Sequence, residues 1–338
     1  MNLIFICSYL NVTDVIDTIE HENDDFMIFT ADKGLEKLFS NLYSSAHVTK
    51  LPNIFESLRP SWKLFLDIVS LNKHKKTFLN IGKTLKPSKI IFYYIGANAF
   101  ESWLIKKMSN DSYVYHRPKV NMRKLKPYKS LRFQFYKFFY NIFYGLRFSS
   151  KSLNGFPSMV INQRFLTLVN SKYYNHNFDE KNIVKFLERK FDNLGQPQVM
   201  LLIGGHYHIE DNEYINVMEE IYSKLLHYYK PCNIAVKNHP NFPVIKGSWC
   251  KDTLVYDDFL SASLLCYNVD TVIGYVSSVL FEAAEIGKNA ISTAYMIQSI
   301  KIGHADEQVD YLTKTLGSKD IIFPRNIDEF MTHLIVEK

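Results

Sequence analysis

The sequence lacks a run of apolar residues long enough to cross a membrane. None of its stretches approaches the roughly 20 uninterrupted apolar residues that a spanning helix needs. Residues 1–7 are mostly apolar but have no basic segment before them, so we expect the first buried strand of the fold here rather than a signal peptide.

Cysteine is scarce: the four cysteines are Cys7, Cys232, Cys250 and Cys266. Their spacing is unpaired, which argues against a disulfide framework or a zinc ribbon. Cys7, Cys232 and Cys266 stand in apolar runs and are expected to pack in the core. Together with the absence of a membrane span, this predicts a cytoplasmic protein.

Two nucleotide-binding signatures are also absent. The chain contains neither G-x-G-x-x-G nor a Walker motif, which argues against a dinucleotide oxidoreductase and a P-loop ATPase. Its 338 residues, 47% of them hydrophobic and 22% charged, are typical of a globular protein and allow two domains.

The basic residues gather in one segment. Residues 117–151 hold ten Lys or Arg, ten Phe or Tyr and no acidic residue. This composition favours peripheral contact with an anionic membrane, on the inner face of the plasma membrane. It would also suit stacking on nucleic acid, although we expect no nucleic-acid partner. A helix with a buried aromatic face and a solvated basic face is the alternative.

Strand-like and helix-like segments alternate along both halves of the chain. This alternation predicts an α/β fold with parallel sheets covered on both faces. We expect an N-terminal acceptor-binding α/β domain over 1–160, a linker over 161–196 and a C-terminal nucleotide-sugar-binding α/β domain over 197–338. The expected strands are Leu3–Cys7, Phe26–Thr30, Lys89–Ile95 and Tyr113–Tyr115 in the first half, and Val199–Ile203, Cys232–Val236, Thr253–Tyr256, Thr271–Ile273 and Ala290–Thr293 in the second.

Two short motifs in the second half carry candidate chemistry. Lys237-Asn238-His239-Pro240 follows one expected strand, and Ser277-Ser278 follows another and opens a helix. Ligands of open α/β sheets bind at the carboxyl ends of the strands, and helix amino termini favour phosphate. These residues therefore predict an anion site of the kind that binds the phosphate of a nucleotide sugar.

Further residues are candidates for the same site. Gly204 and Gly205, after the first strand of the second half, would let a ligand approach the backbone. Glu282 could reach a ribose hydroxyl or could simply lie on the helix surface. Asp211 is expected to cap a helix over about Glu213–Tyr229.

We expect no metal. His206 and His208, with His239, suggest a metal, but an H-x-H pair needs a third ligand with a supporting partner to bind zinc, and none is visible. The pair Asp257-Asp258 could hold Mg²⁺, but we expect it to cap a helix that begins at Phe259.

On these motifs, over about residues 197–295, the chain resembles the bacterial sialyltransferases and related nonulosonic-acid transferases of the GT-B fold. The resemblance rests on their His-Pro motif, here His239-Pro240, and on their paired serines, here Ser277 and Ser278. It implies two Rossmann-like domains facing a cleft. It also implies that His239 and the serines contact the phosphate of a CMP-sugar, and that His239 stabilises the leaving group.

The implied reaction transfers a sialic-acid-type sugar from the CMP donor to a glycan acceptor of a cell-surface polysaccharide or lipooligosaccharide. A metal cofactor is not expected, because CMP carries one phosphate. The acidic pair followed by Gly that supplies the base in those families is absent. Candidates for the base are Asp111, His116 and the pair Asp24-Asp25.

Two alternatives stay open at this stage. One is a GT-B transferase that uses CMP-Kdo or another nucleotide sugar. The other is a non-catalytic protein that binds an anionic polymer or membrane through residues 117–151.

Overall fold

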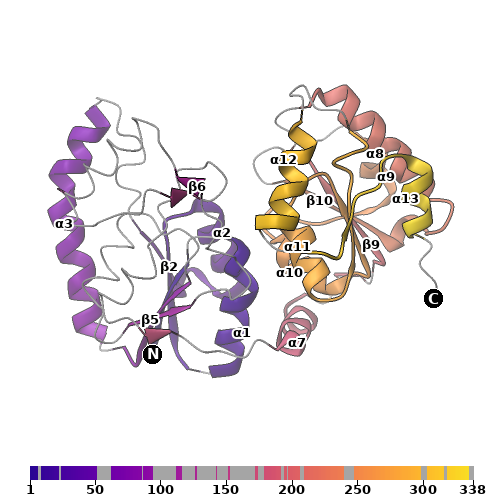
Figure 1. Ribbon diagram of the computed structural model, residues 1–338. Coiled ribbons are helices and arrows are strands. Elements are labelled where there is room, and N and C mark those ends of the chain that lie inside the picture. The colour runs from indigo at the N-terminus through magenta and orange to yellow at the C-terminus, as the bar shows by residue number, and fades with distance from the viewer. Residues whose placement is uncertain are drawn as a thin grey trace. The chain divides into compact units, whose positions relative to one another are not determined.

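The computed structural model describes residues 1–6, 9–22, 24–51, 62–85, 87–93, 112–115, 126–127, 142, 151–152, 172–173, 179–191, 194–195, 197–205, 209–239, 247–297, 303–315 and 318–334. The chain divides into two compact units (Figure 1). Unit 1 comprises Met1–Pro118 and Met122–Asp179, and unit 2 comprises Lys119–Asn121 and Glu180–Lys338.

Unit 1 is built on a six-stranded parallel sheet in the order β3-β2-β1-β4-β5-β8. Its described helices include α1 (Val12–Glu22), α2 (Lys33–Tyr43) and α3 (Trp62–Leu85). The strands are β1 (Asn2–Ile6), β2 (Phe26–Thr30), β3 (Val48–Lys50), β4 (Lys89–Tyr93), β5 (Ser112–Tyr115) and β8 (Lys172–Tyr173), and a separate antiparallel pair joins β6 (Lys126–Pro127) to β7 (Lys151–Ser152).

An aromatic row fixes the register of the three central strands of unit 1. Phe5 of β1 pairs with Phe29 of β2 and with Phe92 of β4. The ring centroids lie 4.8 Å and 4.5 Å apart, and both pairs are stacked. Because a one-residue slip would turn every side chain to the opposite face, this buried row disfavours any other pairing.

Unit 2 repeats the same architecture. Its parallel sheet has the order β11-β10-β9-β12-β13-β14. Figure 1 shows α8 and α13 on one side of this sheet and α10, α11 and α12 on the other. The strands are β9 (Val199–Ile203), β10 (Ile234–Asn238), β11 (Leu254–Val255), β12 (Thr271–Gly274), β13 (Asn289–Ser292) and β14 (Ile321–Ile322); the helices are α7 (Glu180–Lys190), α8 (Asp211–Leu225), α9 (Trp249–Asp252), α10 (Ala262–Leu265), α11 (Ser278–Glu285), α12 (His304–Asp310) and α13 (Ile327–Leu334).

In both units the first strand lies at the centre and the order reverses beside it, as in the Rossmann fold. The predicted α/β class with two Rossmann-like units is thereby confirmed. The cleft between the two units stays a prediction. None of the helices that the structure describes is long and apolar enough to cross a membrane.

Some local expectations need correction. The expected linker over 161–196 contains α7, which packs through buried Ile183, Phe186 and Leu187. Asp211 is the first residue of α8 rather than its cap, and the helix ends at Leu225. Cys266 is buried as expected, whereas Cys232 is exposed.

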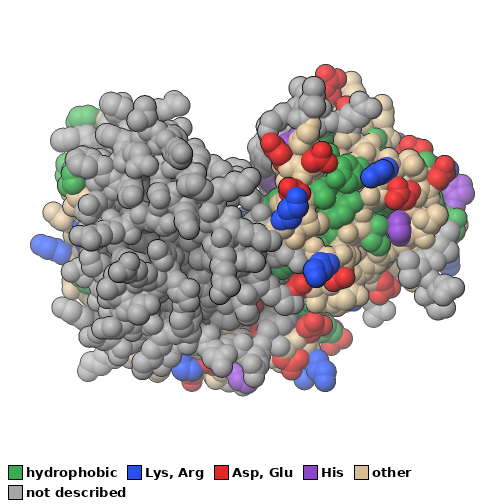
Figure 2. Space-filling model, in the orientation of Figure 1, with side chains coloured by type: hydrophobic (Ala, Val, Ile, Leu, Met, Phe, Trp, Pro, Cys, Tyr) green, Lys and Arg blue, Asp and Glu red, His purple; other side chains and the backbone are tan. Residues whose placement is uncertain are grey.

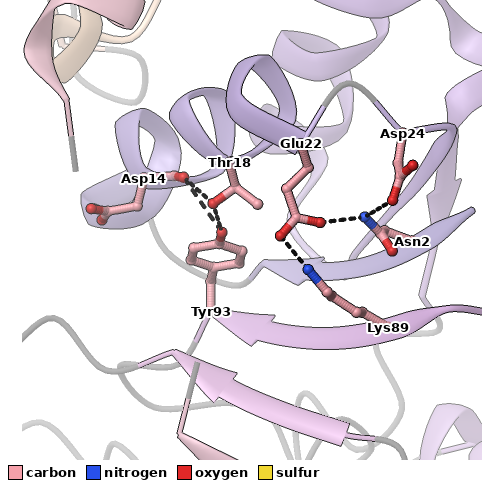
Figure 3. Close-up of polar contacts among 7 residues, drawn as sticks. All are labelled: Asn2, Asp14, Thr18, Glu22, Asp24, Lys89 and Tyr93. Atoms are coloured by element: carbon pink, nitrogen blue, oxygen red, sulfur yellow. Dashed lines mark hydrogen bonds and ion pairs between the residues drawn. The ribbon is translucent and has the colours of Figure 1, made fainter. Parts of the chain in front are cut away.

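A polar network ties together the amino-terminal edge of the unit 1 sheet (Figure 3). Glu22, at the end of α1, accepts hydrogen bonds from Asn2 of β1 at 2.7 Å and from Lys89 of β4 at 2.6 Å. The Glu22 side chain is mostly buried, so water competes weakly for it. The network therefore holds the end of α1 against the first residues of two neighbouring strands.

We predict that Glu22→Gln lowers the free energy of unfolding by about 1 kcal/mol, because a hydrogen-bonded charge pair is lost. The control is Glu36→Gln, which breaks a more exposed pair with Lys50 and should cost about half as much or less. Urea unfolding of the two variants measures both values. Equal losses would contradict a structural role for the Glu22 network.

Candidate functional site

The carboxyl ends of three neighbouring strands meet in unit 2. Strand β9 lies between β10 and β12, with Ile203 paired to Asn238 and Leu202 to Gly274. The backbone N–H of His239 donates to the carbonyl of Ile203 at 2.7 Å, which extends the pairing beyond the end of β10. The strand order reverses between β9 and β12, and at such a point open α/β sheets bind ligands.

This edge collects the residues that the sequence predicted for the donor site. The segments that contain Gly204, His239 and Ser277 each follow one of the three strands. The expected bounds of this strand need correction. Strand β10 begins at Ile234, not Cys232, and extends to Asn238, so Lys237 lies inside the strand.

The backbone conformation after β9 requires two glycines. Gly204 has φ 98° and Gly205 has φ 78°, both in the left-handed region that favours glycine. A Cβ on Gly205 would lie 3.2 Å from Cδ2 of His239, so a larger residue would press on the imidazole. The absence of a side chain thus brings the β9–α8 turn directly against His239.

Tyr214 in the first turn of α8 supports that turn. The backbone N–H of Gly204 donates to the Tyr214 hydroxyl at 2.8 Å. Burial raises the pKa of Tyr214 far above its usual value, so its hydroxyl stays protonated. The sequence analysis missed this residue because Tyr214 also reads as one of the apolar positions of the helix.

Lys237 is the most unusual group of this edge. The residue is only 3% exposed, and its Nζ donates to the backbone carbonyl of Asn238 at 2.9 Å. Among the described residues, no carboxylate lies within ion-pair distance of that Nζ. Burial lowers the pKa of Lys237, while Asp258 and Asp257 oppose the shift. A buried ammonium with three donors and, among the described residues, a single acceptor is costly unless an anion joins it.

His239 lies beside this charge and is half-buried. Burial lowers its pKa, and the positive charge of Lys237 lowers it further. The imidazole is therefore neutral at physiological pH. A neutral imidazole offers one N–H donor and one acceptor nitrogen, which suits hydrogen bonding to a ligand oxygen.

Ser277 and Ser278 open α11 in different ways. Ser277 has extended backbone, and its Oγ accepts from the N–H of Val279 at 3.2 Å, so the expected helix cap is present. No hydrogen-bond partner of the Ser278 hydroxyl is found within the described part of the chain, where the residue is partly exposed. Glu282, one turn further along, is buried, which rules out the helix-surface alternative. Its contact with a ribose stays a prediction.

Asp257 and Asp258 need correction. The helix that was expected to begin at Phe259 is α10, which begins at Ala262 and has Ser261 as its N-cap residue. The two aspartates are exposed in the turn before it and do not cap it. Their negative charges favour the protonated form of Lys237 and so oppose the lowering of its pKa.

The predicted bases divide into two groups. Asp111 and His116 lie outside the described residues, as do His206, His208, Pro240 and most of residues 117–151. Asp24 and Asp25 are exposed at the amino-terminal edge of the unit 1 sheet, where they accept hydrogen bonds from Asn2. That edge is opposite to the one at which α/β sheets bind ligands, so the expectation for this pair is wrong.

Three described carboxylates that follow the first two strands of unit 1 were not predicted from the sequence. Asp14 and Asp17 are buried in α1, and Asp32 caps α2 by accepting from the N–H groups of Gly34 and Leu35. The available signal was their place shortly after the first two strands. Among the described residues no group of three or more His, Cys, Asp or Glu could hold a metal ion.

Neither a protein-family model nor a curated protein sequence matches this chain. It is similar in structure to a UDP-GlcNAc 2-epimerase of Methanocaldococcus jannaschii (12% identity, 100% of this chain and 94% of that one, TM-score 0.45). It is also similar to MurG of Acinetobacter baumannii (9%, 99% and 89%, TM-score 0.40) and to the GT-B domain of a sialyltransferase from Photobacterium damselae (13%, 96% and 100%, TM-score 0.42). Likeness at this level identifies neither a donor nor a reaction.

We predict that Lys237→Met raises the pKa of His239, because the variant removes the nearby positive charge that disfavours protonation. The measurement is an NMR titration of the His239 ring resonances. Lys251→Met, which changes an exposed lysine of α9, is the control and should leave the His239 pKa unchanged. An unchanged pKa in the Lys237 variant would show that the two side chains do not interact.

Proposed function

We propose that this protein is a GT-B glycosyltransferase that transfers a sialic-acid-type sugar from a CMP donor to a glycan acceptor. The observation that carries the proposal is Lys237, a buried ammonium at the carboxyl edge of the unit 2 sheet with no described carboxylate within ion-pair distance. A phosphate would complete its hydrogen bonding and balance its charge. The choice of CMP and of the sugar rests on the resemblance in the His-Pro and Ser-Ser motifs.

The reaction is a displacement at the anomeric carbon of the donor sugar. The acceptor hydroxyl forms the new bond to that carbon while the bond to the CMP phosphate oxygen breaks and its electron pair leaves with CMP. Lys237, His239 and the amino terminus of α11 with Ser278 stabilise the negative charge that develops on the phosphate. A base accepts the hydroxyl proton, and Asp111 and His116 stay the candidates for it.

A donor with one phosphate needs less positive charge than a diphosphate. Lys237 and the α11 terminus supply that charge, so we propose that the donor binds without a metal. Gly204 and Gly205 admit the ligand close to the backbone, and Glu282 is the candidate partner of the ribose. CMP-Kdo and other nucleotide sugars carry the same phosphate chemistry and are the alternatives that a ligand panel separates.

We predict that CMP raises the melting temperature without Mg²⁺, and that UDP, GDP and ADP raise it less. Lys237→Met should weaken CMP binding by about tenfold or more, because a hydrogen bond to a charged group is worth about 1.5–3 kcal/mol. Ser278→Ala should weaken it less, and Lys251→Met not at all. The measurement is a thermal-shift titration of each variant.

Two results would count against this assignment. A response only to UDP or GDP would refute the CMP donor while leaving an anion site at this edge. Unchanged CMP affinity in Lys237→Met would place the nucleotide elsewhere.

An exposed stripe on α3 supports a contact between the enzyme and an anionic membrane. Trp62, Leu66 and Val69 are exposed at a spacing that puts them on one side of the helix, and exposed Lys73 and Lys76 continue that side. Figure 2 shows hydrophobic side chains over one end of α3 and a basic side chain further along it. We propose that this stripe and residues 117–151 hold the enzyme at the membrane, where a lipid-linked acceptor would be reached.

We predict co-sedimentation with vesicles of phosphatidylcholine and phosphatidylglycerol, and little with phosphatidylcholine alone, because the lysines require anionic headgroups. The triple change of Trp62, Leu66 and Val69 to Ser should reduce binding by about tenfold or more. Replacing exposed Val184 and Leu226 of unit 2 by Ser is the control. Membrane binding that the triple change does not reduce would contradict a membrane role for α3. A dimer that forms in the wild type and is lost in the triple variant would also contradict it, because the stripe would then be a dimer contact.

A further inference from the structure

The start of α1 is the counterpart in unit 1 of the β9–α8 turn in unit 2. Strand β1 is the central strand beside which the order of the unit 1 sheet reverses. A 3-10 turn at Tyr9–Asn11 leads directly into α1. Ligands of such sheets bind where the first strand passes into the first helix, at the carboxyl edge.

Two buried polar side chains at this place have no hydrogen-bond partner in the described part of the chain. Asn11 is 0% exposed, and neither its Oδ1 nor its Nδ2 forms a hydrogen bond within the described structure. Thr13 is 1% exposed, and its Oγ1 likewise has no described partner. Asn is a preferred helix cap, yet the Asn11 oxygen does not cap α1.

The next buried hydroxyl along the helix behaves differently. Oγ1 of Thr18 donates to the carbonyl of Asp14 at 2.9 Å and also contacts the Tyr93 hydroxyl (Figure 3). The packing of α1 can therefore satisfy a buried hydroxyl. Unsatisfied buried polar groups are rare in native proteins because each carries a desolvation cost, and a ligand that supplies the missing partners is one explanation for them.

We propose that Asn11 and Thr13 form a subsite for a neutral, hydroxyl-bearing ligand. An amide and a hydroxyl both donate and accept, as sugar hydroxyls do. Naming the ligand as a sugar of the glycan acceptor rests on the proposed function. Because both side chains are buried in the ligand-free chain, binding includes an opening step.

A buried carboxylate of α1 lies on the same side of the helix as Thr13. Buried Asp17 follows Thr13 by four residues within α1, which puts the two side chains on one face. Carboxylates repel phosphate but accept hydrogen bonds from sugar hydroxyls.

Three near-isosteric substitutions test the subsite. Asn11→Leu and Thr13→Val remove unpaired polar groups, so each should keep or raise the melting temperature of the ligand-free protein while it abolishes sugar binding. Thr18→Val removes a paired hydroxyl and should lower the melting temperature. Sugar binding is measured by saturation-transfer NMR with glucose, galactose, N-acetylglucosamine and their disaccharides, with inorganic phosphate as the anionic probe.

The subsite is overturned if Asn11→Leu and Thr13→Val destabilise the protein as Thr18→Val does. It is also overturned if neither variant loses a sugar signal seen in the wild type, if no sugar binds, or if phosphate binds here instead. Lys237→Met should retain the sugar signal. A sugar signal with no CMP binding would therefore refute the proposed donor and keep the subsite, whereas CMP binding without a sugar signal would do the reverse.

Discussion

Parallel pairing of β9 with both β10 and β12 is the constraint on which the candidate site depends. It aligns three carboxyl ends at one edge, so that segments separated by about thirty or more residues in sequence place a glycine turn, an imidazole and a helix terminus together. The glycines are then required by the positive φ angles of that turn, and Gly205 leaves room for the His239 ring. A side chain at Gly205 would disturb both the backbone and the imidazole.

The two units share one strand order but differ in the charged side chains that they bury. Unit 2 buries a cation at its ligand edge, whereas α1 of unit 1 buries two carboxylates and, near its start, two neutral side chains with no hydrogen-bond partner among the described residues. The fold alone does not determine the chemistry of a site. The polar residues at the strand ends determine it. The buried cation of unit 2 suits the proposed anionic donor.

Periodicity and strand-end motifs were enough to predict the α/β class, most of the strands and the grouping of Lys237, His239 and the serines. The burial of Lys237 was not predictable, because a lysine beside polar residues reads as the end of a strand, and only the register shows that it continues β10. Asp14 and Asp17 were missed because acidic residues in a helix usually face water. Asp24 and Asp25 were assigned to the wrong edge, since a sequence pattern does not say at which end of a strand a carboxylate matters.

The most direct test of this account is a crystal structure of the protein with bound CMP. We predict that the phosphate lies at the carboxyl edge of β9, β10 and β12, with Lys237 Nζ within hydrogen-bond distance of a phosphate oxygen and the amino terminus of α11 facing it. A nucleotide bound elsewhere, or at this edge with Lys237 still bonded only to the Asn238 carbonyl, would contradict the central role of the buried cation.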